Sequence, residues 1–209
     1  MHTFLQAIQK RLQDELSYNF PALNAKWLFE YLKDHDWWIR QYDCQRICKK
    51  LENNFNESPN MKERAYFRDV YVWLPDERWG IECMPSCCRC GSNERVRNNG
   101  FRKNHFGRRI IGLKSSYYCL SRRYRCQACE DQVKEVRQSL EATAEEHGLN
   151  YSFDDGQSVN QYTFMAWHRR TLELYPYGRG HEFPAFLTYK SGVDNDLVDL
   201  MRPMMDKGL

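Results

Sequence analysis

The sequence predicts an α+β fold: a helical N-terminal segment, then an antiparallel β module, then a small α+β C-terminal part. Near both ends of the chain, apolar residues recur every three to four positions, which is the period of a helix that packs on one side. The middle of the chain instead holds short aromatic and β-branched stretches separated by turn-forming residues, which favour strands. Four of the nine cysteines lie between residues 83 and 90, and they mark the start of the β module.

The composition indicates a folded chain without a membrane span. Of 209 residues, 42% are hydrophobic and 14% aromatic, enough for one generous domain or two small ones. The apolar runs are far shorter than the roughly 18 residues that a spanning helix needs. The N-terminal stretch mixes charged and apolar residues, unlike a signal peptide. We therefore expect an intracellular protein, and the odd number of cysteines favours reduced thiols, some of them holding metal.

The first expected domain is the helical segment over residues 1–57. Its first helix is predicted by an apolar stripe that consists of Phe4, Leu5, Ile8, Leu12 and Leu16. Two further helices are expected over 23–34 and 36–52, and their candidate N-caps are Asn24 and Asp36. Such a helix pair packs as a hairpin more often than it binds a DNA groove. Cys44 and Cys48 lie four apart on the second of these helices, where core packing is commoner than metal ligation.

A polar stretch around Pro59 indicates a linker, so the second domain is expected over residues 66–209. Its entry is β-branched and aromatic up to Pro75, which predicts a strand. Residues 86–130 are expected to form its compact β core. A helix is predicted after this core, ending at Gly148, and a last helix is predicted over 194–205.

Two C-x-x-C pairs predict a metal site. Cys87 and Cys90 form the first pair, followed directly by Gly91, and 35 residues separate it from the second pair, Cys126 and Cys129. Zn²⁺ prefers four soft ligands in a tetrahedron, and each C-x-x-C turn supplies two thiolates from one side. Two such turns at hairpin tips would hold one structural Zn²⁺ with no open position for chemistry. The alternative interpretation is a pair of buried or redox-active dithiols.

The neighbouring cysteines have different expected roles. Cys88 lies between two candidate ligands, so its side chain should point away from the metal. Other cysteine spacings keep open an alternative ligand set in which Cys83 and Cys88 replace Cys87. Strand alternation places Cys119 on the face opposite Cys126, which predicts a packed thiol.

The chain between the two cysteine pairs is strongly basic. Residues 95–125 include ten Lys or Arg and no Asp or Glu, although the net charge of the whole chain is only +3. Arginines interleaved with aromatic residues on a β surface suit phosphate contact and base stacking. We therefore expect nucleic acid, with DNA favoured, to bind through Arg95, Arg97, Arg102, Lys103, Arg108, Arg109, Arg122 and Arg123. The alternative is that these residues offset the charge of a four-thiolate zinc site, protect strand edges or contact a protein partner.

The order of these motifs resembles a zinc-ribbon domain of unassigned function in eukaryotic transposon-derived, transposase-like proteins. The resemblance covers about residues 66 to 209 and is carried by "VWLPDERWG", the two C-x-x-C pairs, "RRIIGLKSSYYCLSRRYRC" and "FPAFLTYKSGVDNDLVDLMRPMMDKG". It implies a zinc-ribbon-centred fold with Cys87, Cys90, Cys126 and Cys129 as ligands, and it implies no catalytic residue. Cys88 departs from the family pattern, which commonly has proline there. A nuclear location is favoured over a cytoplasmic one.

The sequence contains no motif that indicates an enzyme. It has no Gly-rich phosphate loop, no H-E-x-x-H and no G-x-S-x-G. Acidic groups that could serve a metal-dependent nuclease fragment are Asp154 with Asp155, and Asp194, Asp196 and Asp199. A helix cap and first-turn acids explain Asp194 and Asp196 more simply. The other alternative is a zinc-stabilised protein-interaction module, which would be favoured by dispersed basic residues and an exposed aromatic patch from Trp73, Trp79 and Trp167. Neither a membrane nor a small-molecule substrate is implied.

Overall fold

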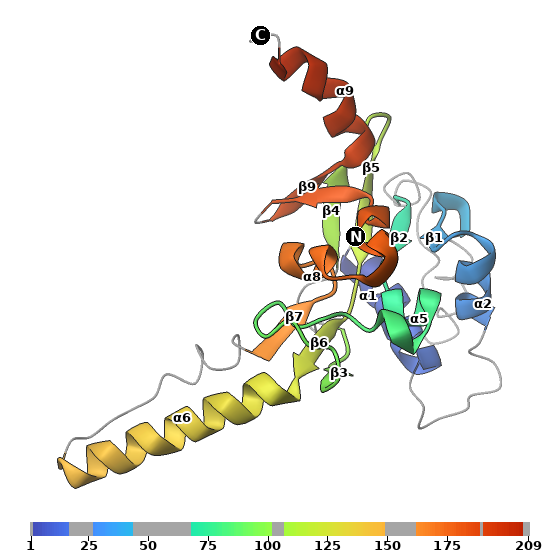
Figure 1. Ribbon diagram of the computed structural model, residues 1–209. Coiled ribbons are helices and arrows are strands. Elements are labelled where there is room, and N and C mark those ends of the chain that lie inside the picture. The colour runs from blue at the N-terminus through green and yellow to red at the C-terminus, as the bar shows by residue number, and fades with distance from the viewer. Residues whose placement is uncertain are drawn as a thin grey trace. The chain divides into compact units, whose positions relative to one another are not determined.

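The computed structural model describes residues 2–16, 27–43, 68–101, 107–148, 162–188 and 190–206, and it confirms the predicted α+β class. The chain divides into two compact units, and each unit combines separate stretches of sequence (Figure 1). Unit 1 comprises the stretches 1–73, 101–121 and 184–209, and unit 2 comprises 74–100 and 122–183. The division of the chain into domains 1–57 and 66–209 stays a prediction.

Unit 1 is built on a six-stranded sheet with the strand order β1-β2-β5-β4-β9-β8. Its strands are β1 (Trp38–Ile39), β2 (Val70–Val72), β4 (Arg108–Ile111), β5 (Ser116–Leu120), β8 (Ala185–Leu187) and β9 (Ser191–Asp194). The β2–β5 and β4–β9 pairs are parallel and the other pairs antiparallel, so the sheet is mixed. The sequence predicts an antiparallel module. This sheet differs from that prediction because it also contains two parallel pairs, β2–β5 and β4–β9, which join strands distant in sequence.

The described residues of unit 1 include the helices α1 (His2–Leu16), α2 (Trp27–Asp34) and α9 (Asn195–Asp206). The predicted stripe of α1 is confirmed at Leu5, Ile8 and Leu12, which are all buried. The last predicted helix corresponds to α9, and the Asp194 side chain accepts a hydrogen bond of 3.0 Å from the backbone N–H of Asp196. This bond has the pattern of a helix N-cap.

The prediction of a helix over 36–52 is wrong at the start of this range. Asp36 and Trp37 have positive φ values of 50° and 66°, and Trp38–Ile39 form the short strand β1. Trp38 pairs with Tyr71 of β2 and lies against the Tyr117 ring with 4.9 Å between ring centroids. Cross-strand aromatic packing thus overrides the local helical period. The positions of Asn24, Cys44, Cys48 and Pro59 lie outside the described residues.

Unit 2 contains a three-stranded antiparallel sheet with the order β3-β6-β7. Its described elements include α5 (Pro75–Trp79), the 3-10 helix η2 (Ile81–Cys83), β3 (Val96–Asn98), β6 (Arg123–Cys126), α6 (Gln127–Glu146), β7 (Thr163–Met165), α8 (Arg169–Glu173) and the 3-10 helix η3 (Pro176–Glu182). The helix predicted after the second cysteine pair is confirmed as α6, and Gly148 follows its end with φ 66°.

The expectation of one compact β core over residues 86–130 is wrong. Strands β3 and β6 belong to the sheet of unit 2, whereas β4 and β5, which lie between them in sequence, belong to the sheet of unit 1. Strand pairing across long sequence distances decides this division, and local patterns do not show it. No helix among the described ranges is both long and apolar enough to cross a bilayer.

Candidate metal centre and basic sheet face

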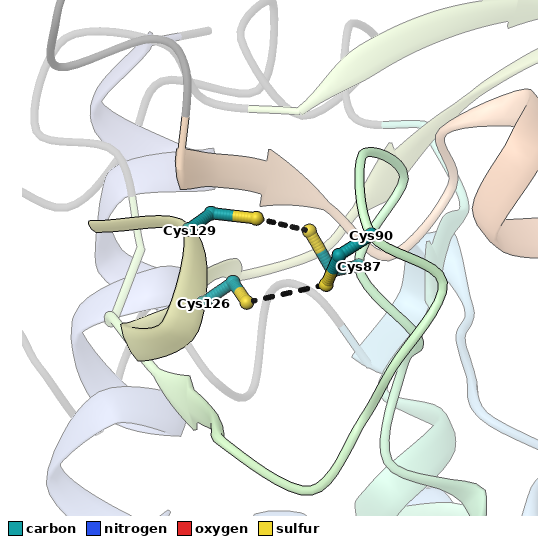
Figure 2. A group of neighbouring side chains, drawn as sticks. All are labelled: Cys87, Cys90, Cys126 and Cys129. Atoms are coloured by element: carbon teal, nitrogen blue, oxygen red, sulfur yellow. Dashed lines mark hydrogen bonds between the residues drawn. The ribbon is translucent and has the colours of Figure 1, made fainter. Parts of the chain in front are cut away.

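The structure brings the four predicted cysteines of unit 2 together. One sulfur atom each from Cys87, Cys90, Cys126 and Cys129 lies within 4.8 Å of the other three (Figure 2). The Sγ atoms of Cys87 and Cys129 are 3.7 Å apart, and those of Cys90 and Cys126 are also 3.7 Å apart. A tetrahedral site with Zn–S bonds of about 2.3 Å has sulfur–sulfur edges of about 3.8 Å. The spacing of the four sulfurs therefore suits a tetrahedral metal ion.

The first cysteine pair lies on a tight turn. The Gly91 N–H donates to the Cys87 carbonyl at 2.9 Å, and the Arg89 N–H points to the Cys87 sulfur at 3.4 Å. Gly91 has φ 79°, as expected for the glycine after a C-x-x-C turn. The backbone of this turn thus presents both sulfurs on one side, and one N–H group supports the first of them.

The second cysteine pair lies at a strand–helix junction, which differs from the predicted hairpin tip. Strand β6 leads directly into α6 (Figure 1). Cys126 is the last residue of β6, and Cys129 lies in the first turn of α6. Residues three apart on a helical turn face the same side, so this junction also presents two sulfurs together. The start of a helix carries partial positive charge, which favours thiolates there.

The four sulfurs differ in their environment. Cys87, Cys126 and Cys129 are buried, whereas Cys90 is exposed. A hydrogen bond from the Cys88 thiol, helped by the backbone N–H groups of Cys90 and Arg89, lowers the pKa of the Cys87 thiol. Burial raises the pKa of the Cys126 and Cys129 thiols. Metal binding at this site must therefore displace protons from the buried thiols.

The remaining described cysteines do not join this group. The four grouped sulfurs match the first of the two ligand sets that the spacing left open, and within the described residues Cys83 and Cys88 are not part of the group. Cys119 is fully buried on β5 of unit 1, and burial raises the pKa of its thiol. The prediction that Cys119 is a packed thiol is confirmed.

Arginines gather on one face of the unit 2 sheet, here called the basic sheet face. Strand alternation and the pairing of Arg97 with Arg125 place the side chains of Arg97, Arg123 and Arg125 on this face. Arg95, in the turn just before β3, is counted with them. The opposite face carries Val96, Tyr124 and Phe164, which are all buried. The core of unit 2 therefore lies on that side, and the arginines point away from it.

Acidic residues of α6 engage two arginines of the basic sheet face. Arg125 pairs with Glu130, and Arg95 pairs with Asp131 at 2.6 Å. The hydrogen bonds from Arg125 and Lys134 lower the pKa of the Glu130 carboxyl. Glu130 and Asp131 directly follow Cys129 in the sequence "CED". These two acids lie just beyond the basic stretch, which ends at Arg125, and they are the sequence signal that part of its charge is neutralised. Within the described residues, Arg97 and Arg123 have no acidic partner.

Arg122 differs from its predicted role in nucleic-acid binding. Its side chain is only 3% exposed, and its guanidinium pairs with Asp76 and, at 2.8 Å, with Glu77. Its Nε also donates to the Tyr124 hydroxyl at 3.1 Å. A buried guanidinium held by two carboxylates cannot reach a phosphate, so we remove Arg122 from the candidate surface.

The other basic residues predicted to bind nucleic acid lie elsewhere. Arg108 and Arg109 belong to β4 of unit 1, where Arg108 donates to the Thr188 carbonyl at 2.5 Å and Arg109 is exposed. Arg102 and Lys103 lie outside the described residues.

The structure does not support the exposed tryptophan patch of the protein-interaction alternative. Trp73 of unit 1 is fully buried and Trp167 of unit 2 is 7% exposed, which leaves Trp79 half-buried.

Among the ranges that the structure describes, the four cysteines are the only His, Cys, Asp and Glu side chains grouped closely enough to hold a metal ion. The carboxylates Asp194, Asp196 and Asp199 form no such group, and Asp154 and Asp155 lie outside the described ranges.

Comparison of the chain with models of protein families, with curated proteins and with solved structures gives no match.

Proposed function

We propose that unit 2 is a nucleic-acid-binding module stabilised by one structural Zn²⁺. The observation that carries the proposal is that β6 supplies both a sulfur of the four-cysteine group, Cys126, and two arginines of the basic sheet face, Arg123 and Arg125. A metal that fixes the end of β6 also fixes these arginines. The resemblance to transposon-derived zinc-ribbon domains makes DNA the proposed nucleic acid and the nucleus the proposed location.

Zinc suits the four-cysteine group because four thiolates are the ligand set of closed structural sites. Structural zinc contributes on the order of 10–16 kcal/mol of apparent binding free energy, which small domains use for folding. Four protein ligands leave no position for substrate, so the proposed role of the metal is structural. We propose no catalytic activity for this centre.

The charge of the basic sheet face limits the expected number of phosphate contacts. Glu130 and Asp131 already engage Arg125 and Arg95, so Arg97 and Arg123 are the principal candidates. We expect two to four phosphate contacts in total, which gives a slope of about −1.8 to −3.6 for log affinity against log salt concentration. Between 50 and 200 mM salt, the affinity should then fall about 10- to 150-fold.

The test is fluorescence anisotropy of a labelled mixed-sequence DNA duplex with the zinc-loaded full chain across this salt series. The double variant Arg97→Ala with Arg123→Ala should weaken binding and flatten the slope by about two. A matched control, Lys33→Ala with Arg202→Ala, removes two exposed cations from unit 1 and should leave the slope unchanged. If neither a duplex nor a single strand binds at low salt, the nucleic-acid proposal fails and a protein partner becomes the better account.

A further inference from the structure

Unit 2 carries a strongly exposed tyrosine, Tyr177, on a turn of unusual backbone geometry. Tyr177 lies in η3 and is 88% exposed, the largest value among the exposed apolar and aromatic side chains of the described residues. Within those residues, its ring makes no contact with another ring and no hydrogen bond. The full face of the ring is therefore available to a ligand.

The backbone holds Tyr177 in an unusual conformation. Tyr177 has φ 57° and ψ 23°, and Gly178 after it has φ 68° and ψ 13°. The left-handed region disfavours side chains with a Cβ atom, and tyrosine is an unusual residue there compared with Gly, Asn or Asp. Such outliers persist only where the surrounding structure enforces them, and they concentrate at functional positions.

The turn around Tyr177 is held in place by its packing against α8 and by buried residues on either side of η3. A Cβ atom on Gly180 would lie 1.8 Å from the Leu172 carbonyl oxygen, so the turn packs directly on the backbone at the end of α8. Tyr175 and Phe183, on either side of η3, are buried, and the Tyr175 hydroxyl donates to the Ala166 carbonyl at 3.3 Å. The Tyr177 ring is thus presented by a preorganised support, which lowers the entropy cost of binding.

Cationic and aromatic groups surround the same turn. The Arg179 guanidinium lies over the Trp79 ring, 5.0 Å from its centroid, and pairs with Glu182 at 4.0 Å. The exposed His181 ring packs against the turn, with its Cδ2 atom 3.7 Å from the position of a Cβ on Gly178. Arg179 follows Tyr177 by two residues in the same turn. A turn that carries both an exposed aromatic ring and an arginine suits single-stranded nucleic acid, because the ring can stack on a base and the arginine can contact a phosphate.

We propose that Tyr177 stacks on an unpaired base of single-stranded nucleic acid. This inference rests on the proposed function and extends it, because the bases of an intact duplex are stacked on one another and present no free face. Each base stacked on an aromatic side chain contributes about 5- to 150-fold in affinity. Since every base has such a face, the contact should tolerate changes of sequence.

The experiment compares Tyr177→Ala and Tyr177→Phe in the zinc-loaded full chain, using a labelled oligo-dT strand and a duplex of equal length. Tyr177→Ala should lose about 5- to 150-fold in affinity for the single strand and little for the duplex. Tyr177→Phe keeps the ring and should bind like the unaltered chain. Tyr42→Ala is the matched control, since it removes a tyrosine of unit 1 that is 67% exposed. Zinc content and melting temperature verify that each variant folds.

Three outcomes would overturn the stacking proposal. The first is unchanged single-strand affinity in Tyr177→Ala, the second is an equal loss on both oligonucleotides, and the third is an equal loss in Tyr177→Phe. The result also separates the two proposals. If Arg97→Ala with Arg123→Ala weakens binding but Tyr177→Ala does not, only the stacking proposal fails. If the unaltered chain binds neither oligonucleotide, the proposed function itself fails.

Discussion

Arg122→Ala should destabilise unit 2 strongly, because Arg122 is the cation of a buried ionic cluster. Its side chain is 3% exposed, and its partners Asp76 and Glu77 have side chains 5% and 17% exposed. The Tyr124 hydroxyl donates to Asp76 at 2.5 Å and completes the cluster. Removing the guanidinium leaves two carboxylates largely buried without their cation.

Breaking a buried ion pair from one side costs about 3–5 kcal/mol. We expect the lower end of this range, about 3 kcal/mol, since Glu77 can regain some hydration and Asp76 keeps its bond from Tyr124. With a urea m-value of about 1–3 kcal/mol per M, the unfolding midpoint should fall by about 1–3 M.

Urea unfolding of the zinc-loaded chain, followed by circular dichroism, measures this change. Arg123→Ala is the matched control because it removes the neighbouring arginine, which is only half-buried and has no acidic partner among the described residues. Its cost should stay below about 1 kcal/mol. Adding Asp76→Asn to Arg122→Ala should cost less than the sum of the two single changes, since the residues share one network. Equal midpoints for Arg122→Ala and Arg123→Ala would refute the buried cluster.

Three further changes test other parts of the account. Gly91→Ala should cost about 1 kcal/mol, measured as a lower melting temperature of the zinc-loaded chain, because its φ of 79° disfavours a Cβ although no atom lies within 4 Å of one; an unchanged melting temperature would contradict the turn geometry. Cys119 should resist alkylation in the folded chain and react after unfolding, because burial raises the pKa of its thiol, so mass spectrometry that finds rapid native labelling would contradict its burial. Burial and the hydrogen bond to Asp194 raise the pKa of Tyr117, so its contribution to stability is complete below the ordinary tyrosine pKa of about 10 and is lost as the pH rises above it. In Tyr117→Phe, urea midpoints should decline less steeply between about pH 9 and 11 than in the unaltered chain, and an identical decline would argue against this role.

Local features of the chain were predictable from the sequence. The helical stripe of α1 and the end of α6 follow from the spacing of apolar residues and from glycine at a helix end. The choice of the four grouped cysteines also follows from spacing, because a C-x-x-C turn presents two sulfurs wherever it occurs. These features depend on interactions between residues within a few positions of one another.

Features that depend on distant partners were not predictable. Arg122 belongs to a basic stretch in the sequence, yet its partner Asp76 lies 46 residues earlier, so its burial could not be inferred from its neighbours. The parallel pairing of β2 with β5 likewise joins segments far apart in the chain and divides the expected β core between two sheets. In both cases, the tertiary partner decides the role of the residue.

Metal content of purified cysteine variants tests the central claim most directly. The unaltered chain should retain one Zn²⁺ per molecule by elemental analysis, and Co²⁺ substituted for it should show the strong visible absorption of a tetrahedral thiolate site. Cys87→Ser and Cys126→Ser should each lose the metal and melt at a lower temperature, whereas Cys88→Ser, the adjacent control, should keep both properties. Full metal retention with unchanged melting in Cys87→Ser and Cys126→Ser, or metal loss in Cys88→Ser alone, would contradict the assigned centre.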